Sequence, residues 1–257
     1  MKNYRHFISF KTLVDKEVRR FASIWIQTIL PPVITTALYF LIFGQVIGGR
    51  IGMVGGVSYV QYIAPGLIMM SVITNAYGNV STSFFMAKFT RSIEELLVAP
   101  MPNYLLLLGY IVGGVLRGVI VAIVVAMTAA FFTRLSIHHI FIMIFAVVFS
   151  AALFSLAGFI NALFAKKFDA ISIVPTFILT PLTYLGGVFF SIDLLPGFWK
   201  EIALLNPILY FIELFRYGML GIAGISIPLA VCILLIFFII LYVTALILLK
   251  KGVGIRS

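Results

Sequence analysis

The segment RSIEELLVAPMP, residues 91–102, interrupts a chain that is highly apolar on either side. Glu94 and Glu95 are adjacent in it, and Pro100 and Pro102 end any helix that the segment forms. Because a carboxylate in the hydrocarbon of a bilayer is costly, we expect this segment to lie in water between two membrane spans. The apolar stretches on its two sides therefore decide the fold.

The composition is typical of a membrane protein with several spans. Of the 257 residues, 63% are hydrophobic and 10% are charged, and the mean hydropathy is +1.19. The formal net charge is +10, but so few charged residues form no broad basic surface, so no nucleic-acid partner is expected. Cys232, the single cysteine, lies in an apolar run and cannot form an internal disulfide.

Six apolar stretches predict an all-α membrane protein with six transmembrane helices, forming a single domain over residues 1–257. A helix needs about 20 apolar residues to cross a bilayer. The stretches are residues 25–46, 60–85, 104–132, 139–164, 171–190 and 227–249. Pro175 and Pro181 lie inside the fifth stretch and should bend or break it.

The distribution of Lys and Arg predicts the orientation, because positive residues are retained on the cytoplasmic side. Most of the 18 lie in the N-terminal tail, after the second and fourth stretches, and after the sixth. The other connections hold few: Arg50, Arg134, Lys200 and Arg216. Both termini and the segment with Glu94 and Glu95 are therefore expected in the cytoplasm.

Two further segments are neither spans nor simple loops. Residues 1–24 are expected to be a cytoplasmic tail with an amphipathic interfacial helix, serving as a membrane anchor or a docking element. Its apolar face is Phe10, Leu13, Val14, Val18, Phe21 and Trp25. Residues 193–221 carry too much charge for a span, and predict a re-entrant helical hairpin on the outer side. On one helix, Glu213 and Arg216 are spaced to pair.

The chain lacks recognisable catalytic chemistry. It has no Gly-x-x-x-x-Gly-Lys phosphate loop and no metal-ligand spacing, so no catalytic or metal-binding residue is predicted. None of its acids falls in the middle of a predicted span, which disfavours a stand-alone secondary carrier or channel, the alternative function. Arg117 lies near the middle of the third stretch, among glycines spaced for close helix contact. It is either a pathway residue or a structural residue with a buried partner.

Four segments resemble the ABC-2 type permeases, the membrane subunits of a class of ABC exporters, and most of all the small bacterial YadH-like permeases. They are FTRSIEELLVAPMP (89–102), YIAPGLIMMSVITNAYGNVS (62–81), DAISIVPTFILTPLTYLGGVFFSIDLLP (169–196) and LLNPILYFIELFRYGMLG (204–221). The resemblance covers nearly the whole chain. It implies a homodimer in the bacterial inner membrane, joined through the first and fifth spans. It also implies two separate ABC ATPase subunits that bind Mg-ATP, with no cofactor in this chain.

The resemblance assigns residues 86–103 as the cytoplasmic coupling segment. Its candidate contacts with the ATPase are Phe89, Arg91, Ile93, Glu94, Glu95, Leu96 and Leu97. Polar and aromatic residues of the spans are candidates for the pathway: Asn75, Tyr77, Asn79, Arg117, Thr180 and Tyr184. Candidates in the outer hairpin are Asn206, Pro207, Tyr210, Glu213 and Arg216. The apolar character of the spans favours an amphipathic, lipid-type or glycan-type cargo.

Overall fold

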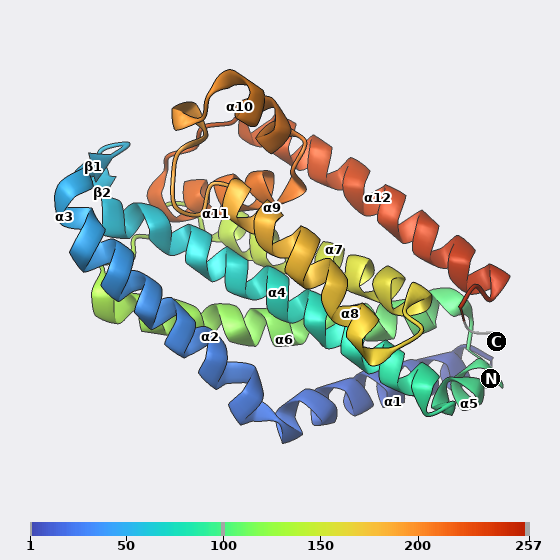
Figure 1. Ribbon diagram of the computed structural model, residues 1–257. Helices are drawn as coiled ribbons and strands as arrows, with labels where there is room; N and C mark the ends of the chain where they lie inside the picture. Colours follow the sequence, from blue (N-terminus) through green and yellow to red (C-terminus); the bar gives the residue numbers. More distant parts are fainter. Residues whose placement is uncertain (1, 99–100, 255–257) are drawn as a thin grey trace.

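The computed structural model describes residues 2–98 and 101–254, and their side chains apart from those of Lys2, Asn3, Gln45, Leu96 and Leu97. This part of the chain is a helical bundle with one small antiparallel hairpin (Figure 1). The elements, in order, are α1 (Lys2–Ser23), α2 (Trp25–Tyr39), η1 (Phe40–Ile47), α3 (Gly48–Ile51), β1 (Met53–Val54), β2 (Val57–Ser58), α4 (Tyr59–Phe89), α5 (Ser92–Val98), α6 (Asn103–Phe132), α7 (Ile140–Phe164), α8 (Phe168–Val174), η2 (Pro175–Leu179), α9 (Thr180–Leu185), η3 (Ile192–Leu194), α10 (Gly197–Leu204), α11 (Pro207–Leu220) and α12 (Ile227–Lys251).

Helix α4 is the central element of the bundle, and α6 and α7 pack along it (Figure 1). Ser58 begins it through a capping box, in which the Ser58 hydroxyl accepts from the Gln61 amide and the Gln61 side chain accepts from the Ser58 amide. Gly158 of α7 lies directly against α4, because a Cβ at this position would overlap the Tyr77 carbonyl oxygen. Small residues therefore let the two backbones approach closely.

Five helical stretches in the described ranges are long and apolar enough to cross a membrane. They are Trp25–Ile51, Asn103–Phe132, Ile140–Phe164, Phe168–Leu185 and Ile227–Lys251. The bent pair α10 and α11 would be a sixth if it were one span. The predicted second span, α4, is a 31-residue helix but is not in this set. Its many polar side chains, such as Asn75 and Asn79, lower its hydropathy while its interior position shields them.

The ends of the first and fifth predicted spans differ most from the structure, and the second extends to Phe89 rather than residue 85. The first continues past residue 46 through the wide turns of η1 to Ile51. The fifth begins at Phe168 and is interrupted at Pro175 by the π-helical turn η2, so the predicted break is confirmed. It ends at Leu185 rather than at residue 190, because Gly186 and Gly187 follow and Gly187 takes a φ of +78°.

The predicted N-terminal helix is present as α1, and it packs against α6 and α4. Leu13 and Phe21 are buried on its inner face against the bundle, whereas Trp25 is 60% exposed and begins α2. The position of this helix in the membrane interface stays a prediction. The inner face also holds Glu17, which is completely buried. The purely apolar face predicted for this helix was therefore wrong at one position, where an acid faces the bundle.

The predicted hairpin is two helices, α10 and α11, that meet at 85°. Asn206 caps α11 by accepting from the Ile208 amide at 3.0 Å, and it donates to the Leu182 carbonyl at 2.6 Å. The predicted pair of Glu213 and Arg216 is confirmed, and both side chains are buried. Arg216 also donates to the Gly187 carbonyl at 2.6 Å.

Candidate functional site

Helix α5 is a short element that a sharp turn holds at the end of α4. Arg91 forms this turn with a φ of +60°, the one non-glycine residue with a positive φ in the described ranges. Ser92 donates to the Ala87 carbonyl at 3.3 Å, and the Glu94 amide donates to the Arg91 carbonyl at 3.0 Å. The direction of α5 is thus fixed by the local backbone rather than by a flexible linker.

The exposed surface of α5 combines charge with apolar side chains. Glu94 and Glu95 are exposed, and Val98 is 87% exposed. Phe89, the last residue of α4 and three residues before α5, is 71% exposed next to this surface. Ile93 is 2% exposed and belongs to the same buried cluster as Phe85. Its predicted contact with a partner stays a prediction. The side chains of Leu96 and Leu97, and Pro100, lie outside the described residues.

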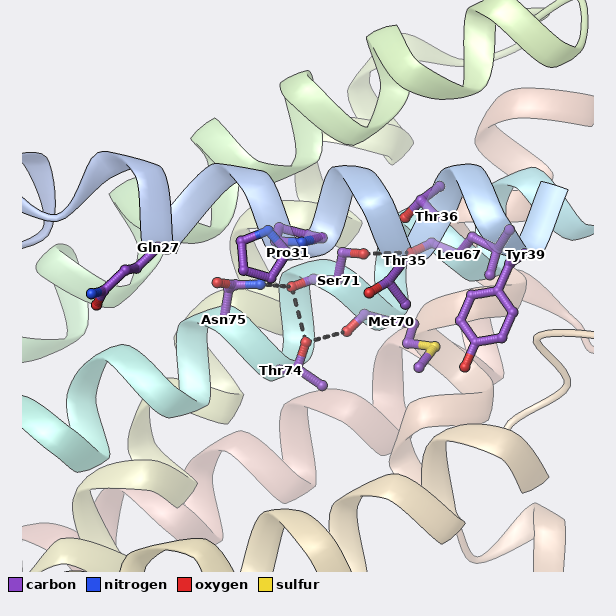
Figure 2. A pocket seen from close by; sticks show the side chains of 11 residues that line it. Gln27, Pro31, Thr35, Thr36, Tyr39, Leu67, Met70, Ser71, Thr74 and Asn75 are labelled. Carbon is purple, nitrogen blue, oxygen red and sulfur yellow. Dashed lines mark hydrogen bonds between the residues drawn. The ribbon is translucent and has the colours of Figure 1, made fainter. Parts of the chain in front are cut away.

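A polar groove of about 220 Å³ runs between α2 and α4. Figure 2 shows Gln27 and Asn75 at one end and Tyr39 at the other. The α4 wall carries Ser71, Thr74 and Asn75, which donate to carbonyls of their own helix. The α2 wall carries Pro31, Pro32, Thr35 and Thr36. Because these side chains bond to the backbone of α4, the α4 wall of the groove is moderately polar and carries no charge.

An aromatic group lies at the Tyr39 end of the groove. The hydroxyls of Tyr39 and Tyr184 are 3.0 Å apart, and Phe189 stacks near both rings, at 5.3 and 5.9 Å between centroids. Phe43 stacks on Phe189 at 4.6 Å. These contacts bring the predicted pathway residue Tyr184 to the groove and join α2 to α9.

Arg117 lies near the Asn75 end of the groove. Its guanidinium donates to the Asn75 Oδ1 at 3.2 Å and to the Asn79 Oδ1 at 3.4 Å. Asn79 is completely buried and accepts through the same oxygen from Arg20 at 2.7 Å. Three of the predicted pathway residues, Asn75, Asn79 and Arg117, are thus brought together.

Two residues of this region were not predicted, Glu17 and Arg20 of α1. Arg20 lies 3.2 Å from Glu17, and the other Glu17 oxygen accepts from Ser83 at 2.6 Å. Gly113 makes room for them, because a Cβ there would come within 2.7 Å of the Glu17 Cβ. The repeated Gly-x-x-x-Gly spacing of α6 was the available signal, since Gly109 and Gly113 face α1 whereas Gly114 and Gly118 face α4 and α7.

Two other predicted pathway residues do not line the groove. Tyr77 is 2% exposed and packs in the core. Thr180 donates to the Pro175 carbonyl at 2.9 Å and bridges the π-helical turn of its own helix. A role of either residue in the pathway stays a prediction.

The hairpin candidates all make contacts that stabilise the hairpin itself. Tyr210 donates to the Leu204 carbonyl at 2.6 Å, and Pro207 occupies the first turn of α11. The Arg216 guanidinium lies 4.1 Å from the centre of the Tyr62 ring, and Glu213 accepts from the Gly224 amide at 2.6 Å. The hairpin is therefore attached to α4 and to the Gly187 turn by buried charge.

Comparisons with known proteins agree with this architecture. Residues 8–220 match the family model of the ABC-2 type transporter. The chain is 52% identical over 252 residues to the inner membrane transport permease YadH of Escherichia coli K12, with 98% of both chains covered. It is 24% identical over 230 residues to nodulation protein J of Rhizobium leguminosarum bv. viciae, with 88% of both covered. This chain is a member of the ABC-2 type transporter family.

Proposed function

We propose that this chain is the permease subunit of an ATP-driven exporter in the bacterial inner membrane. Two copies form the transport unit, and two separate ABC ATPase subunits bind Mg-ATP and dock on α5 from the cytoplasm. Six spans cross the bilayer, with α4 as the second and the α10–α11 pair as an outer re-entrant hairpin. The family membership and the inner membrane permease to which the chain is similar support this proposal.

The observation that carries the proposal is the form of α5. Helix α5 has 7 residues and buries Ile93 on one side. Glu94, Glu95 and Val98 on the other side are exposed, so no part of the chain that the structure describes covers them. Apolar side chains surrounded by charge are typical of a surface that binds another protein. The fixed turn at Arg91 would transmit a movement of α5 to α4.

The arrangement of the chain ends supports a common side for α5 and both termini. The first and last described residues lie at the same end of the bundle as α5 (Figure 1). Lys88, at the end of α4, donates to the carbonyls of Ala162, Leu163 and Ala165 at the end of α7. Gly254 contacts Leu163. With the Lys and Arg distribution of the sequence, this end is the cytoplasmic one.

An exposed apolar face favours a homodimer through α2 and the α8–α9 region. Ile34 and Leu38 of α2 are about half exposed, and Phe177 of η2 is 73% exposed. The Tyr39–Tyr184 contact places these helices next to each other. The groove opens beside this face, and its mixture of hydroxyl, amide and apolar groups suits an amphipathic cargo.

Affinity purification of the tagged chain from its native membranes, followed by mass spectrometry, tests the proposal. We expect a protein with a phosphate loop in equal amount, and ATP hydrolysis that depends on the presence of the permease. Purification of a chain that transports in vesicles without any such subunit would instead support a stand-alone carrier.

A further inference from the structure

The side chains of Glu17, Arg20, Asn79 and Arg117 form a group, here called the arginine cluster, where α1, α4 and α6 meet. Glu17 and Asn79 are completely buried, whereas Arg20 and Arg117 are half-buried. It contains more hydrogen-bond donors than acceptors. Within residues 2–98 and 101–254, no hydrogen-bond partner is found for the buried Nε atoms of Arg20 and Arg117 or for the Nδ2 of Asn79. One oxygen, Oδ1 of Asn79, accepts from both arginines. Buried donors are normally satisfied, so three unpaired donors in one group indicate a missing acceptor.

The charges of the arginine cluster are also unbalanced. Glu17 lies in an ion pair with Arg20, and Arg117 has no acidic partner within 4.0 Å among the described residues. Arg117 contacts only amide oxygens, at 3.2 and 3.4 Å, which are long distances for a charged donor. One positive charge therefore remains without a counterion inside the bundle, where such a charge is expected to be paired.

The groove leads to this unpaired charge. Asn75 lines the groove (Figure 2) and is one of the two asparagines whose side-chain oxygens accept from Arg117. The groove itself is lined by neutral groups. A molecule lying in it with its polar end toward Asn75 would bring that end next to the arginine cluster.

We propose that the arginine cluster binds an oxyanion, the charged head group of an amphiphile whose apolar part lies along the groove between α2 and α4. An oxyanion supplies the acceptors that Arg117, Arg20 and Asn79 lack, and the planar guanidinium suits phosphate and carboxylate oxygens. The assignment of this amphiphile as a cargo rests on the proposed transport function, whereas the binding itself does not.

The test uses the purified chain in mixed micelles without an ATPase, so its failure leaves the ATPase proposal untouched. Thermal unfolding is followed while phosphatidylglycerol, phosphatidylcholine or inorganic phosphate is added. We expect phosphatidylglycerol to raise the unfolding temperature and phosphatidylcholine to have no effect. Arg117→Gln should weaken the apparent affinity for phosphatidylglycerol about tenfold, since it removes a charged donor. The matched control is Arg134→Gln, because Arg134 is exposed in a loop outside the cluster.

Each outcome is decisive. Stabilisation by phosphate that competes with phosphatidylglycerol would support oxyanion binding and show that the head group alone suffices. If inorganic phosphate does not compete with phosphatidylglycerol, the site binds the intact lipid and not the head group alone. The proposal would be overturned if phosphatidylglycerol and phosphatidylcholine stabilised the wild-type chain equally. It would also be overturned if Arg117→Gln bound phosphatidylglycerol as tightly as the wild-type chain.

Discussion

Single buried charges in this molecule stabilise contacts between distant segments. The side chains of Glu213 and Arg216 are both buried, and together they contact Tyr62, Gly187 and Gly224. Glu17 similarly joins α1 to α4 through Ser83. A buried ion pair adds little to the free energy of unfolding when compared with apolar residues of the same size. The loss of one partner, however, leaves a buried charge without compensation.

Glu213→Ala should therefore destabilise the protein strongly. Breaking a buried pair from one side costs about 3–5 kcal/mol, and here the Gly224 amide also loses its acceptor. Fluorescence-detected size exclusion after heating measures the effect in detergent. Glu201→Ala serves as the control, because Glu201 is exposed on α10. A Glu213→Ala protein as heat-resistant as this control would show that the pair carries no stability.

The sequence predicted single residues well where spacing alone decided the contact. The i, i+3 relation placed Glu213 beside Arg216, and the glycine spacing around Arg117 predicted close helix contacts, which Gly113, Gly114 and Gly118 make. It failed for Glu17, because helical periodicity in α1 cannot show that a gap over Gly113 accepts an acid. It could not show that Ile93 is buried within this chain, because an apolar residue on a short helix faces the core or the solvent according to tertiary packing.

At the level of elements, close packing of α4 against α7 and α6 holds the centre of the bundle. Six of the segments predicted from apolar length correspond to helices in the structure, because about 20 apolar residues in sequence leave few other conformations in lipid. The exact ends could not be predicted. The π-helical turns of η1 contain no proline that would mark them in the sequence. The end of α9 at Leu185 depends on the backbone conformation of Gly187, which the sequence does not specify.

Two glycine substitutions test this packing. Gly158→Ala should destabilise the protein by about 1–3 kcal/mol, since the added methyl group overlaps the backbone of α4. Gly78→Ala is the matched control on α4, where nothing lies within 4 Å of the new Cβ, and it should be neutral or slightly stabilising. Thermal unfolding compares the two. Equal behaviour of both variants would show that the α4–α7 contact is looser than described.

The whole molecule exposes an apolar face on α2 and the α8–α9 region that a second copy is proposed to cover. In a chain with Cys232 replaced by serine, Phe177→Cys should form a disulfide between copies in native membranes. Val243→Cys on α12, also exposed, is the control and should not. Cross-linking of Val243→Cys without Phe177→Cys would place the dimer interface on α12 instead.

The central claim is that this chain is driven by a separate ATPase docked on α5, and one measurement tests it directly. The proposed ATPase is co-purified with the wild-type chain and with two separate variants, Phe89→Asp and Val98→Asp. The control variant is Ile137→Asp, because Ile137 is exposed in the loop between α6 and α7. An acid at a docking anchor is buried without a partner in the complex, so it should weaken binding strongly. We predict that Phe89→Asp and Val98→Asp stay folded but lose both the ATPase and the stimulated hydrolysis, while Ile137→Asp keeps both. Full retention of a stimulated ATPase by both Phe89→Asp and Val98→Asp would contradict the account.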